Sequence, residues 1–276
     1  MAEKDVTFRF KEFSVRQDRC AMKVGTDGVL LGALARVESQ ESRVESQESR
    51  VESQESMFNV LDIGTGTGVV ALMLAQRYPE ARIVGVEIDP EAAAQAAENF
   101  AASPWGDRLI ARCGDVNVNV NENENENETD NKFQLIVCNP PYYAHSPAAS
   151  SRARDTARRA DSLTHEQLVE CAARLMADGG RLEVIIPYTT ADEFIHTAWL
   201  HGLHLMRRID IRTKPGKAFK RSVVAVANEN ENGHTPPSQA TPPLTEGEEL
   251  GNLLLFNADG SATEEYRALT GEFYLD

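Results

Sequence analysis

The sequence predicts an α/β protein with a doubly wound, mostly parallel sheet and an antiparallel hairpin edge. Short apolar stretches with strand character alternate with helix-forming stretches between residues 59 and 201, a pattern typical of parallel sheets covered on both faces. A glycine-rich turn joins the first strand to its helix. Two more strands, separated by a short loop, follow the last helix and indicate the hairpin.

The elements are predicted in the following order. A strand at Asn59–Asp62 is followed by a helix of good helix formers at Val69–Gln76. Strands come next at 82–89, 109–115 and 133–138, then a helix from Ser162 to Ala177, ended by Asp178-Gly-Gly180. The last elements are a strand at 181–187, a helix near 190–201 and strands at 203–212, 221–227 and 252–257. In such sheets ligands bind at the carboxyl ends of the strands.

Three low-complexity stretches, 37–56, 116–131 and 228–250, interrupt this pattern. All three are too poor in apolar side chains to offset the entropy of ordering, and the heptad repeat in 37–56 has only one valine per repeat, too few for a coiled coil. Their net charges of −4, −5 and −5 account for −14 of the formal charge of −15. We expect one domain over residues 1–276 with three disordered inserts, and the acidity therefore does not exclude a nucleic-acid substrate.

The topology places two of these inserts, 37–56 and 228–250, toward the edge opposite the ligand edge. The third, 116–131, replaces a crossover helix that such a fold would have. An acidic interaction segment is the alternative interpretation of 37–56.

Composition argues against several classes of protein. No apolar run approaches the roughly 18 residues of a membrane span, and the N-terminus lacks a signal-peptide pattern. The four cysteines have no C-x-x-C spacing, and Cys113 and Cys138 are expected to be buried in strands. His201 and His204 stand three apart, but no carboxylate or cysteine in the sequence completes a metal-binding pattern with them. We predict a cytoplasmic, monomeric protein without a metal site.

The tetrapeptide Asn139-Pro140-Pro141-Tyr142 directly follows a predicted strand. Each proline fixes φ near about −65° and pushes the preceding residue to extended geometry, so the Asn139 side-chain oxygen and the Pro140 carbonyl can face one point. Two acceptors beside the ring of Tyr142 suit a planar conjugated amine, namely the amino group of adenine or cytosine, or a carboxamide. For the tetrapeptide alone, a plain tight turn is the alternative.

The glycine-rich turn runs Asp62-Ile-Gly64-Thr-Gly66-Thr-Gly68. A dinucleotide site needs Gly-x-Gly-x-x-Gly, but Val69 stands where that pattern requires the third glycine. The turn instead resembles the S-adenosylmethionine (SAM) loop of Rossmann-like methyltransferases, whose ligand has no phosphate. Glu87, about 20 residues further on, would accept hydrogen bonds from ribose hydroxyls, and Asp115 from the cofactor's adenine amine. A solvated strand end is the alternative for either acid alone.

Further segments resemble one family closely. They are Phe8–Val15, Asp18–Ala33, the glycine loop, Ala92–Asn99, Ser103-Pro-Trp105, Asn139–Tyr143 and Tyr266–Leu275. The chain resembles the bacterial tRNA1(Val) adenine-37 N6-methyltransferases over nearly its whole length, except for the three low-complexity stretches. The resemblance implies a Rossmann-like SAM-methyltransferase fold, SAM as cofactor and tRNA as substrate. It also implies that Lys23–Gly28 closes over the methionine end of SAM, with Thr26 and Asp27 as candidate contacts; a helix cap is an equal alternative.

Two basic loops are expected to open at the carboxyl edge. One, after Tyr142, carries Arg152, Arg154, Arg158 and Arg159, and the other, in the hairpin, carries Lys214, Lys217, Lys220 and Arg221. Their convergence on one edge favours contacts with tRNA phosphates, whereas a solvated face is the alternative for either loop alone.

The expected chemistry is methyl transfer to an exocyclic amine. Asn139 and Pro140 would draw the amine toward tetrahedral geometry, and Tyr142 would stack on the base, so positioning and electrostatics would replace a dedicated general base. A release-factor glutamine N5-methyltransferase uses the same tetrapeptide and is the alternative enzyme, although only about 58 residues precede the first strand here. A non-catalytic SAM- or RNA-binding module is the remaining alternative.

Overall fold

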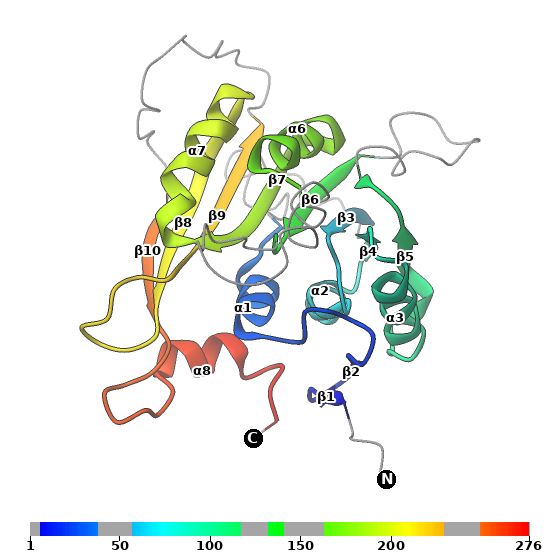
Figure 1. Cartoon of the computed structure of the whole chain (residues 1–276), viewed down its shortest axis with the longest axis horizontal. Coiled ribbons are helices and arrows are strands. Elements are labelled where there is room, and N and C mark those ends of the chain that lie inside the picture. The colour runs from blue at the N-terminus through cyan, green and yellow to red at the C-terminus, as the bar shows by residue number, and fades with distance from the viewer. Residues whose placement is uncertain (1–5, 38–56, 117–131, 141–162, 229–248, 276) are drawn as a thin grey trace, which may run out of the picture.

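The computed structural model describes residues 6–37, 57–116, 132–140, 163–228 and 249–275, and its centre is an eight-stranded sheet (Figure 1). The strands lie in the order β10-β8-β9-β7-β6-β3-β4-β5. Their bounds are β3 (Phe58–Ile63), β4 (Ala81–Glu87), β5 (Leu109–Cys113), β6 (Phe133–Cys138), β7 (Met176–Pro187), β8 (Leu203–Arg212), β9 (Arg221–Asn228) and β10 (Glu249–Leu254).

The strand directions confirm the predicted fold class. Strands β7, β6, β3, β4 and β5 are mutually parallel, while β9 runs antiparallel to both β7 and β8. Strand β10 lies outside the hairpin, parallel to β8. It covers 249–254 rather than the predicted 252–257. The carboxyl ends of the parallel strands therefore share one edge with the β8–β9 loop, as expected.

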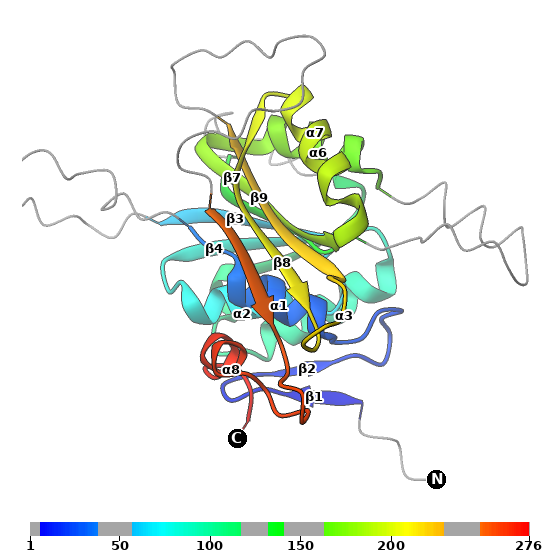
Figure 2. The same ribbon diagram turned by 90° about the vertical axis from the view of Figure 1, so that its left-hand side faces the viewer.

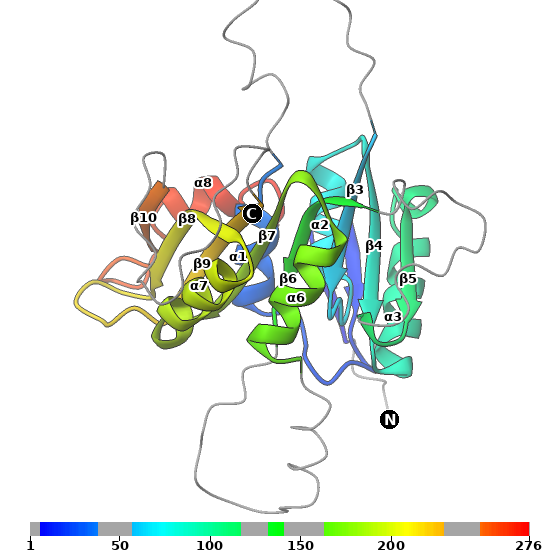
Figure 3. The same cartoon turned by 90° about the horizontal axis from the view of Figure 1, so that it is seen from above.

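Six helices cover the two faces of the sheet in the described part of the chain. They are α1 (Thr26–Leu34), α2 (Val69–Arg77), α3 (Pro90–Ala101), α6 (His165–Leu175), α7 (Ala191–Leu200) and α8 (Glu264–Thr270). Buried side chains of α1, α2, α3 and the α8 region form one apolar core with one face of the sheet, and those of α6 and α7 form a second core with the other face. In Figure 3, which is seen from above, α6 and α7 lie in front of the sheet, and α1 and α2 lie behind it.

Local chemistry explains where two of these helices begin. The Asp89 side chain accepts hydrogen bonds from the backbone N–H groups of Glu91 and Ala92, and Pro90 stands in the first turn of α3. At α6, Thr164 and Gln167 form a capping box, in which each side chain accepts from the other residue's backbone N–H.

The predicted boundary near residue 177 was wrong. Helix α6 ends at Leu175 instead of Ala177, and β7 begins at once at Met176. The Asp178-Gly-Gly180 stretch is not a free turn but an irregularity in β7, opposite a register shift between Phe133 and Leu135. A side chain at Gly180 would meet the Phe133 carbonyl oxygen at 2.8 Å, so the two strands approach closely here.

The two ends of the chain pack together, which no sequence pattern predicted. A short hairpin of β1 (Thr7–Arg9) and β2 (Ser14–Arg16) lies beside the segment that follows α8 (Figure 2). The Phe10 ring stacks on Phe13 and on Tyr274, with ring centroids 4.5 and 5.9 Å apart. The Lys11 backbone N–H donates to the Phe273 carbonyl oxygen at 2.8 Å. This hairpin fixes the start of the segment that leads to α1.

The three low-complexity stretches lie almost wholly outside the described residues. The prediction that they are disordered therefore concerns residues that the structure does not describe. The described residues that flank 37–56 and 228–250, namely Phe58, Asn228 and Glu249, lie at the edge opposite the carboxyl ends of the parallel strands, which agrees with the predicted topology. Among the described helices, none is long and apolar enough to cross a membrane.

Candidate active site

The glycine loop lies at the carboxyl edge, between the end of β3 and the start of α2. Gly64, Gly66 and Gly68 have φ angles of 69°, 54° and 83°. The backbone N–H groups of Gly64 and Thr65 both donate to the Val86 carbonyl oxygen of β4, at 2.8 and 3.1 Å. A Cβ atom at Gly64 would meet nothing within 4 Å. The loop is therefore held against the neighbouring strand while its outer side is open.

Gly68 is required at its position for two reasons. It is the N-cap of α2 in the left-handed region, which residues with a Cβ atom rarely adopt. A Cβ atom there would also lie 2.5 Å from the Phe100 ring of α3. Gly85 of β4 has a similar packing constraint, because its Cβ atom would lie 2.8 Å from Thr65 Oγ1. Sequence reasoning missed Gly85, although a glycine inside a strand signals close approach.

Asp62 lies beneath the glycine loop and is 2% exposed. Its Oδ2 accepts a hydrogen bond from the Thr65 hydroxyl at 2.6 Å. Burial raises the pKa of Asp62 to about 6, against the opposing effect of hydrogen bonds from Thr65 and the backbone of Ala71. The carboxyl group thus links the loop to the first turn of α2.

Glu87 ends β4 and faces the loop from the other side. Its Oε2 accepts from the Gly66 N–H at 2.9 Å, and its Oε1 accepts from the Asp89 N–H at 3.1 Å. A carboxylate offers about four lone-pair positions, so two remain available for hydroxyl groups. Asp115 follows β5 and is exposed next to this strand end, where the Gly114 N–H donates to the Glu87 carbonyl oxygen at 2.9 Å. Ile88, which sequence reasoning missed, is 55% exposed beside them.

Asn139 and Pro140 follow β6, which pairs directly with β3, so the tetrapeptide starts beside the glycine loop. Asn139 is partly exposed and Pro140 is buried. A Cβ atom at Gly28 of α1 would lie 3.2 Å from Val69 Cγ1 and 4.0 Å from Asn139 Nδ2. The first turns of α1 and α2 and the end of β6 therefore meet at one place. Tyr142 lies outside the described residues.

The start of α1 places Thr26 and Asp27 at the same edge. Gly25, not Thr26 or Asp27, is the N-cap residue of α1, and no side chain caps the helix. The helix-cap alternative was therefore wrong. Instead, Arg221 Nε donates to Asp27 Oδ2 at 2.8 Å, which joins α1 to the start of β9. The structure thus pairs an expected cofactor contact with an expected tRNA contact.

The segment from β2 to α1, residues 17–25, crosses from α3 to this edge, and two side chains of α3 hold its start. Asn99 accepts from the Arg16 N–H and donates to the carbonyl oxygens of Arg16 and Thr67. Gln95 accepts from the Arg19 N–H at 3.0 Å. Burial and the nearby Glu87 and Asp89 raise the pKa of the Cys20 thiol to about 11, so this segment passes close to the acidic end of β4. We name it the strap; sequence reasoning missed the two anchoring side chains.

The structure describes one of the two predicted basic loops. Lys214, Lys217 and Lys220 are exposed in the β8–β9 loop at the carboxyl edge, whereas Arg221 is half-buried and paired with Asp27. The other loop, with Arg152, Arg154, Arg158 and Arg159, lies outside the described residues.

The structure shows the burial of two cysteines and the surroundings of His201. Cys138 is buried, but the expectation for Cys113 was wrong, because it ends the edge strand β5 and is exposed. Glu166 and Glu170 of α6 come together with His201 at the end of α7, with ligand atoms within 4.8 Å of one another. His201 Nε2 is 3.4 Å from Glu170 Oε1. Since the two glutamates are exposed and the His201 ring also contacts the Thr197 carbonyl oxygen, an ordinary surface ion pair accounts for this group.

The arrangement as a whole defines a class. A glycine loop and an acidic strand end lie at the carboxyl edge of a sheet with one antiparallel strand near its end, which is the Rossmann-like methyltransferase architecture. The family model of the methyltransferase small domain matches residues 49–195. A solved structure of a predicted O-methyltransferase from Agrobacterium tumefaciens superposes with a TM-score of 0.60 at 17% identity, over 90% of this chain and 96% of that chain, and this likeness shows the fold alone.

Curated relatives identify the family within this class. The tRNA1(Val) (adenine(37)-N6)-methyltransferase of Yersinia enterocolitica is 38% identical over 98% of this chain and 92% of its own length. The enzyme of the same name from Bacteroides thetaiotaomicron is 39% identical over 97% of each chain. The chain belongs to the tRNA1(Val) (adenine(37)-N6)-methyltransferase family.

Proposed function

We propose that this protein transfers a methyl group from SAM to N6 of an adenine in tRNA, namely adenine 37 beside the anticodon of tRNA1(Val). The observation that carries the proposal is the position of Asn139, at the end of β6 beside the glycine loop and the start of α1. The relatives that bear this name match the chain almost from end to end, which supports the same substrate.

The residues around the loop fit SAM. The outer side of Gly64 is open, Glu87 retains two lone-pair positions for ribose hydroxyls, and Ile88 offers an exposed apolar side chain to an adenine face. Asp115 at the neighbouring strand end is suited to accept from the adenine amine. Asp62, being buried, would act by holding the loop rather than by touching the cofactor. SAM supplies an electrophilic methyl group on a sulfonium centre.

The tetrapeptide supplies the chemistry at the acceptor. The amine of adenine is a weak nucleophile because its lone pair is conjugated with the ring. Hydrogen bonds from its two N–H groups to the Asn139 side chain and the Pro140 carbonyl would favour tetrahedral geometry and direct the lone pair toward the methyl group. An adenine in an anticodon loop is partly unpaired, so moving it out of the stack costs less than it would in a duplex.

The strap and α1 would complete the pocket. Asn99 and Gln95 hold the strap next to the glycine loop, and the Asp27–Arg221 pair holds the start of α1 against β9. Both anchors would restrict access of water to the methionine end of SAM. The exposed Lys214, Lys217 and Lys220 would contact tRNA phosphates at the same edge.

We also propose that the chain acts as a single, metal-free domain and as a cytoplasmic monomer. The contact between the two chain ends supports the single domain, because the N-terminal hairpin and the segment after α8 pack on one shared core.

The test compares two asparagines at opposite edges of the sheet: Asn139, which follows β6, and Asn228, which ends β9. Asn139→Ala should reduce the transfer rate at least about 1,000-fold, because the hydrogen bond to the adenine amine is lost and the amine is no longer aligned with the methyl group. The Kd for SAM should stay within about twofold. Asn228→Ala, at the opposite edge, is the matched control and should transfer at nearly the wild-type rate. Both are assayed with tRNA1(Val) and with a release factor as methyl acceptors.

The acceptor assay separates the alternatives. Methylation of tRNA at adenine N6 by the wild-type protein is the expected result. Transfer only to the release factor would refute the tRNA assignment, and near-normal transfer by Asn139→Ala would refute the assignment of Asn139.

A further inference from the structure

Two aromatic rings and two arginines form a group beside the β8–β9 loop that the site described above does not use. We name these four residues the stacking cluster: Tyr188, Arg208, Arg212 and Phe219. The ring centroids of Tyr188 and Phe219 are 5.3 Å apart with an interplanar angle of 34°. Arg208 Cζ lies 5.3 Å from the Tyr188 centroid, and Arg212 Cζ lies 4.8 Å from the Phe219 centroid. All four side chains are partly exposed.

The two arginines differ in how their charge is balanced. Arg208 Nε donates to Asp210 at 2.8 Å, and its Nη1 donates to Asp192 of α7 at 2.5 Å. For Arg212, no carboxylate lies within ion-pair distance among the residues that the structure describes. The Arg208 end of the cluster is therefore neutralised and closed against α7, whereas the Arg212 end keeps its full charge.

The backbone holds the cluster in place. The Lys217 N–H donates to the Lys214 carbonyl oxygen at 3.2 Å across Pro215-Gly216, and Gly216 has a φ of 71°, the combination expected of a type II turn. The Lys220 N–H donates to Ile211, and the Tyr188 N–H donates to the Lys220 carbonyl oxygen. These backbone hydrogen bonds continue the strand pairing into the loop. The rings of Tyr188 and Phe219 therefore need little further ordering to bind a partner.

The cluster lies on the same edge as Asn139. Tyr188 follows β7, which pairs with β6, and the other three residues belong to β8 and the loop that leads to β9. With about 4.8 Å between neighbouring strands, the cluster is roughly 5 to 15 Å from the end of β6 along the sheet edge. A nucleotide adjacent to the target adenine can span such a distance.

We propose that the Arg212 end of the stacking cluster, made of Arg212 and Phe219, binds the base of an unpaired tRNA nucleotide next to the target adenine, and that Arg208 takes no part in this contact. The base would continue the stack on the outer face of the Arg212 guanidinium, which Phe219 holds from its other side. Single-stranded RNA is recognised by such stacking on aromatic rings and guanidinium planes, whereas phosphate contacts alone need only charge, which the nearby lysines supply. This inference rests on the proposed function, since it names the part of the tRNA that this edge recognises.

The test uses Arg212→Lys, which keeps the charge and removes the planar group. It should raise the KM for tRNA about tenfold, with the Kd for SAM and kcat unchanged. Arg208→Lys is the matched control, because it makes the same change at the closed end of the cluster and should change the KM less than twofold. Thermal unfolding of both variants checks that they fold.

A second measurement identifies the nucleotide. A panel of tRNAs, each ligated with one abasic position in the anticodon loop, should show one position next to the target adenine whose base loss costs the wild-type protein about tenfold in kcat/KM. For Arg212→Lys, base loss at that position should leave kcat/KM unchanged, whereas base loss at the other positions should have the same effect as on the wild-type protein. Equal sensitivity of both proteins at every position, or an unchanged KM for Arg212→Lys, would overturn the inference.

Wild-type transfer to intact tRNA separates this inference from the proposed function. If the wild-type protein transfers no methyl group to tRNA, the proposed function fails and the inference fails with it. If it does transfer and Arg212→Lys behaves like Arg208→Lys, only the stacking cluster is refuted.

Discussion

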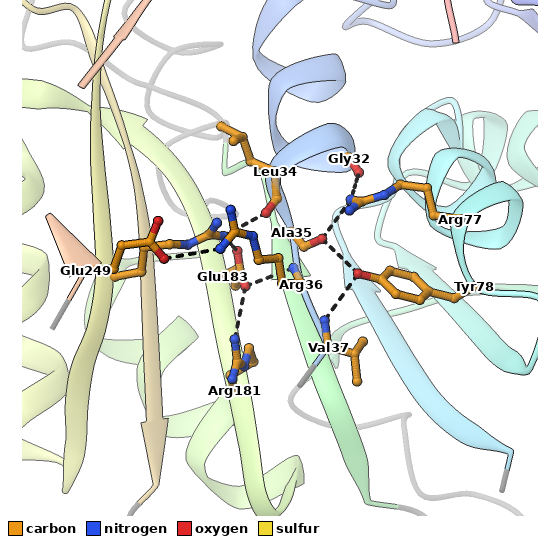
Figure 4. A network of polar contacts seen from close by, with 11 residues as sticks. Gly32, Leu34, Ala35, Arg36, Val37, Arg77, Tyr78, Arg181, Glu183 and Glu249 are labelled. Carbon is orange, nitrogen blue, oxygen red and sulfur yellow. Dashed lines mark hydrogen bonds and ion pairs between the residues drawn. The ribbon is translucent and has the colours of Figure 1, made fainter. Parts of the chain in front are cut away.

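The two halves of the sheet hold their carboxylates in opposite ways. In the half made of β3, β4 and β5, Asp62 and Glu87 accept hydrogen bonds from backbone N–H groups and a hydroxyl, with no cation in an ion pair among the described residues. In the half made of β7, β8 and β9, Glu183 accepts from Arg207 Nη2 at 2.6 Å and lies 3.9 Å from Arg181 Nη1. The Arg36 N–H also donates to Glu183 at 3.1 Å, as Figure 4 shows.

These different surroundings suit Glu87 to binding a ligand and Glu183 to stabilising the fold. Glu87 is partly exposed and accepts two hydrogen bonds, so it has lone pairs left with which it can bind a ligand. Glu183 is fully buried, so a ligand cannot reach it, and its contacts with Arg207 and the Arg36 backbone tie β7 and β8 to the end of α1. Burial raises the pKa of Glu183, against the opposing effect of Arg207, the Arg36 backbone and Arg181. The first half therefore leaves carboxylate oxygens available to a ligand, and the second half holds α1 in place.

Removing the Glu183 charge should have the largest effect on stability. Glu183→Gln leaves Arg207, itself 4% exposed, buried without its counter-charge, and should lower the free energy of unfolding by about 3–5 kcal/mol. Urea denaturation measures this. Glu249→Gln, which breaks the exposed pair with Arg36 in the same region, is the control and should cost less than about 1 kcal/mol. Equal losses for both variants would contradict the supporting role of Glu183.

The stability contributed by Asp62 should depend on pH. Burial raises the pKa of the folded-state carboxyl group from 3.8 to about 6, so the unfolded chain ionises first and stability falls as the pH rises between these values. The loss is on the order of 3 kcal/mol, and Asp62→Asn lacks it because an amide does not ionise. Urea denaturation at pH 4 and at pH 7 should show the difference between the two proteins shifting in favour of Asp62→Asn. A difference that stays constant with pH would argue that Asp62 is not desolvated.

Glu87 should show the converse of Glu183. Glu87→Gln replaces one acceptor oxygen by a donor, so it should raise the Kd for SAM about 30-fold, equivalent to about 2 kcal/mol, and leave the free energy of unfolding within about 1 kcal/mol. Isothermal titration with SAM provides the affinity, and Glu183→Gln at a temperature where it is folded provides the comparison. A stability loss without an affinity loss would place Glu87 with Glu183 as a supporting group.

The Asp27–Arg221 pair should show the smallest effect. Asp27→Asn and Arg221→Gln should each raise the KM for SAM about fivefold, equivalent to about 1 kcal/mol, because either change releases the start of α1 from β9. The double variant should be no worse than the worse single variant, since both remove one contact. Effects that multiply in the double variant would show that the two residues act separately.

Local patterns allowed the positions of much of the candidate site to be predicted. Three parts of the candidate site lie at strand ends: the glycine loop after β3, the acid at the end of β4 and the tetrapeptide after β6. Apolar patterns in the sequence predict these strands, and parallel strands bring their carboxyl ends to one edge. The partners of these groups were not predictable in the same way. Asp27 and Arg221 are 194 residues apart, Arg36 and Glu183 are 147 apart, and neither pair has a periodic signal.

The sequence by itself determined most strands of the large sheet, the turn geometry of the glycine loop and the place of Asn139-Pro140 directly after β6, because these depend on φ restrictions and on apolar periodicity within a few residues. Only the tertiary structure decided which charged groups remain available to a ligand and which form ion pairs with one another. Arg208 and Arg212 are four residues apart on one strand, yet Arg208 pairs with two carboxylates, whereas Arg212 pairs with none in the part of the chain that the structure describes. Pairing depends on distance and burial, and these exist only once the chain is folded.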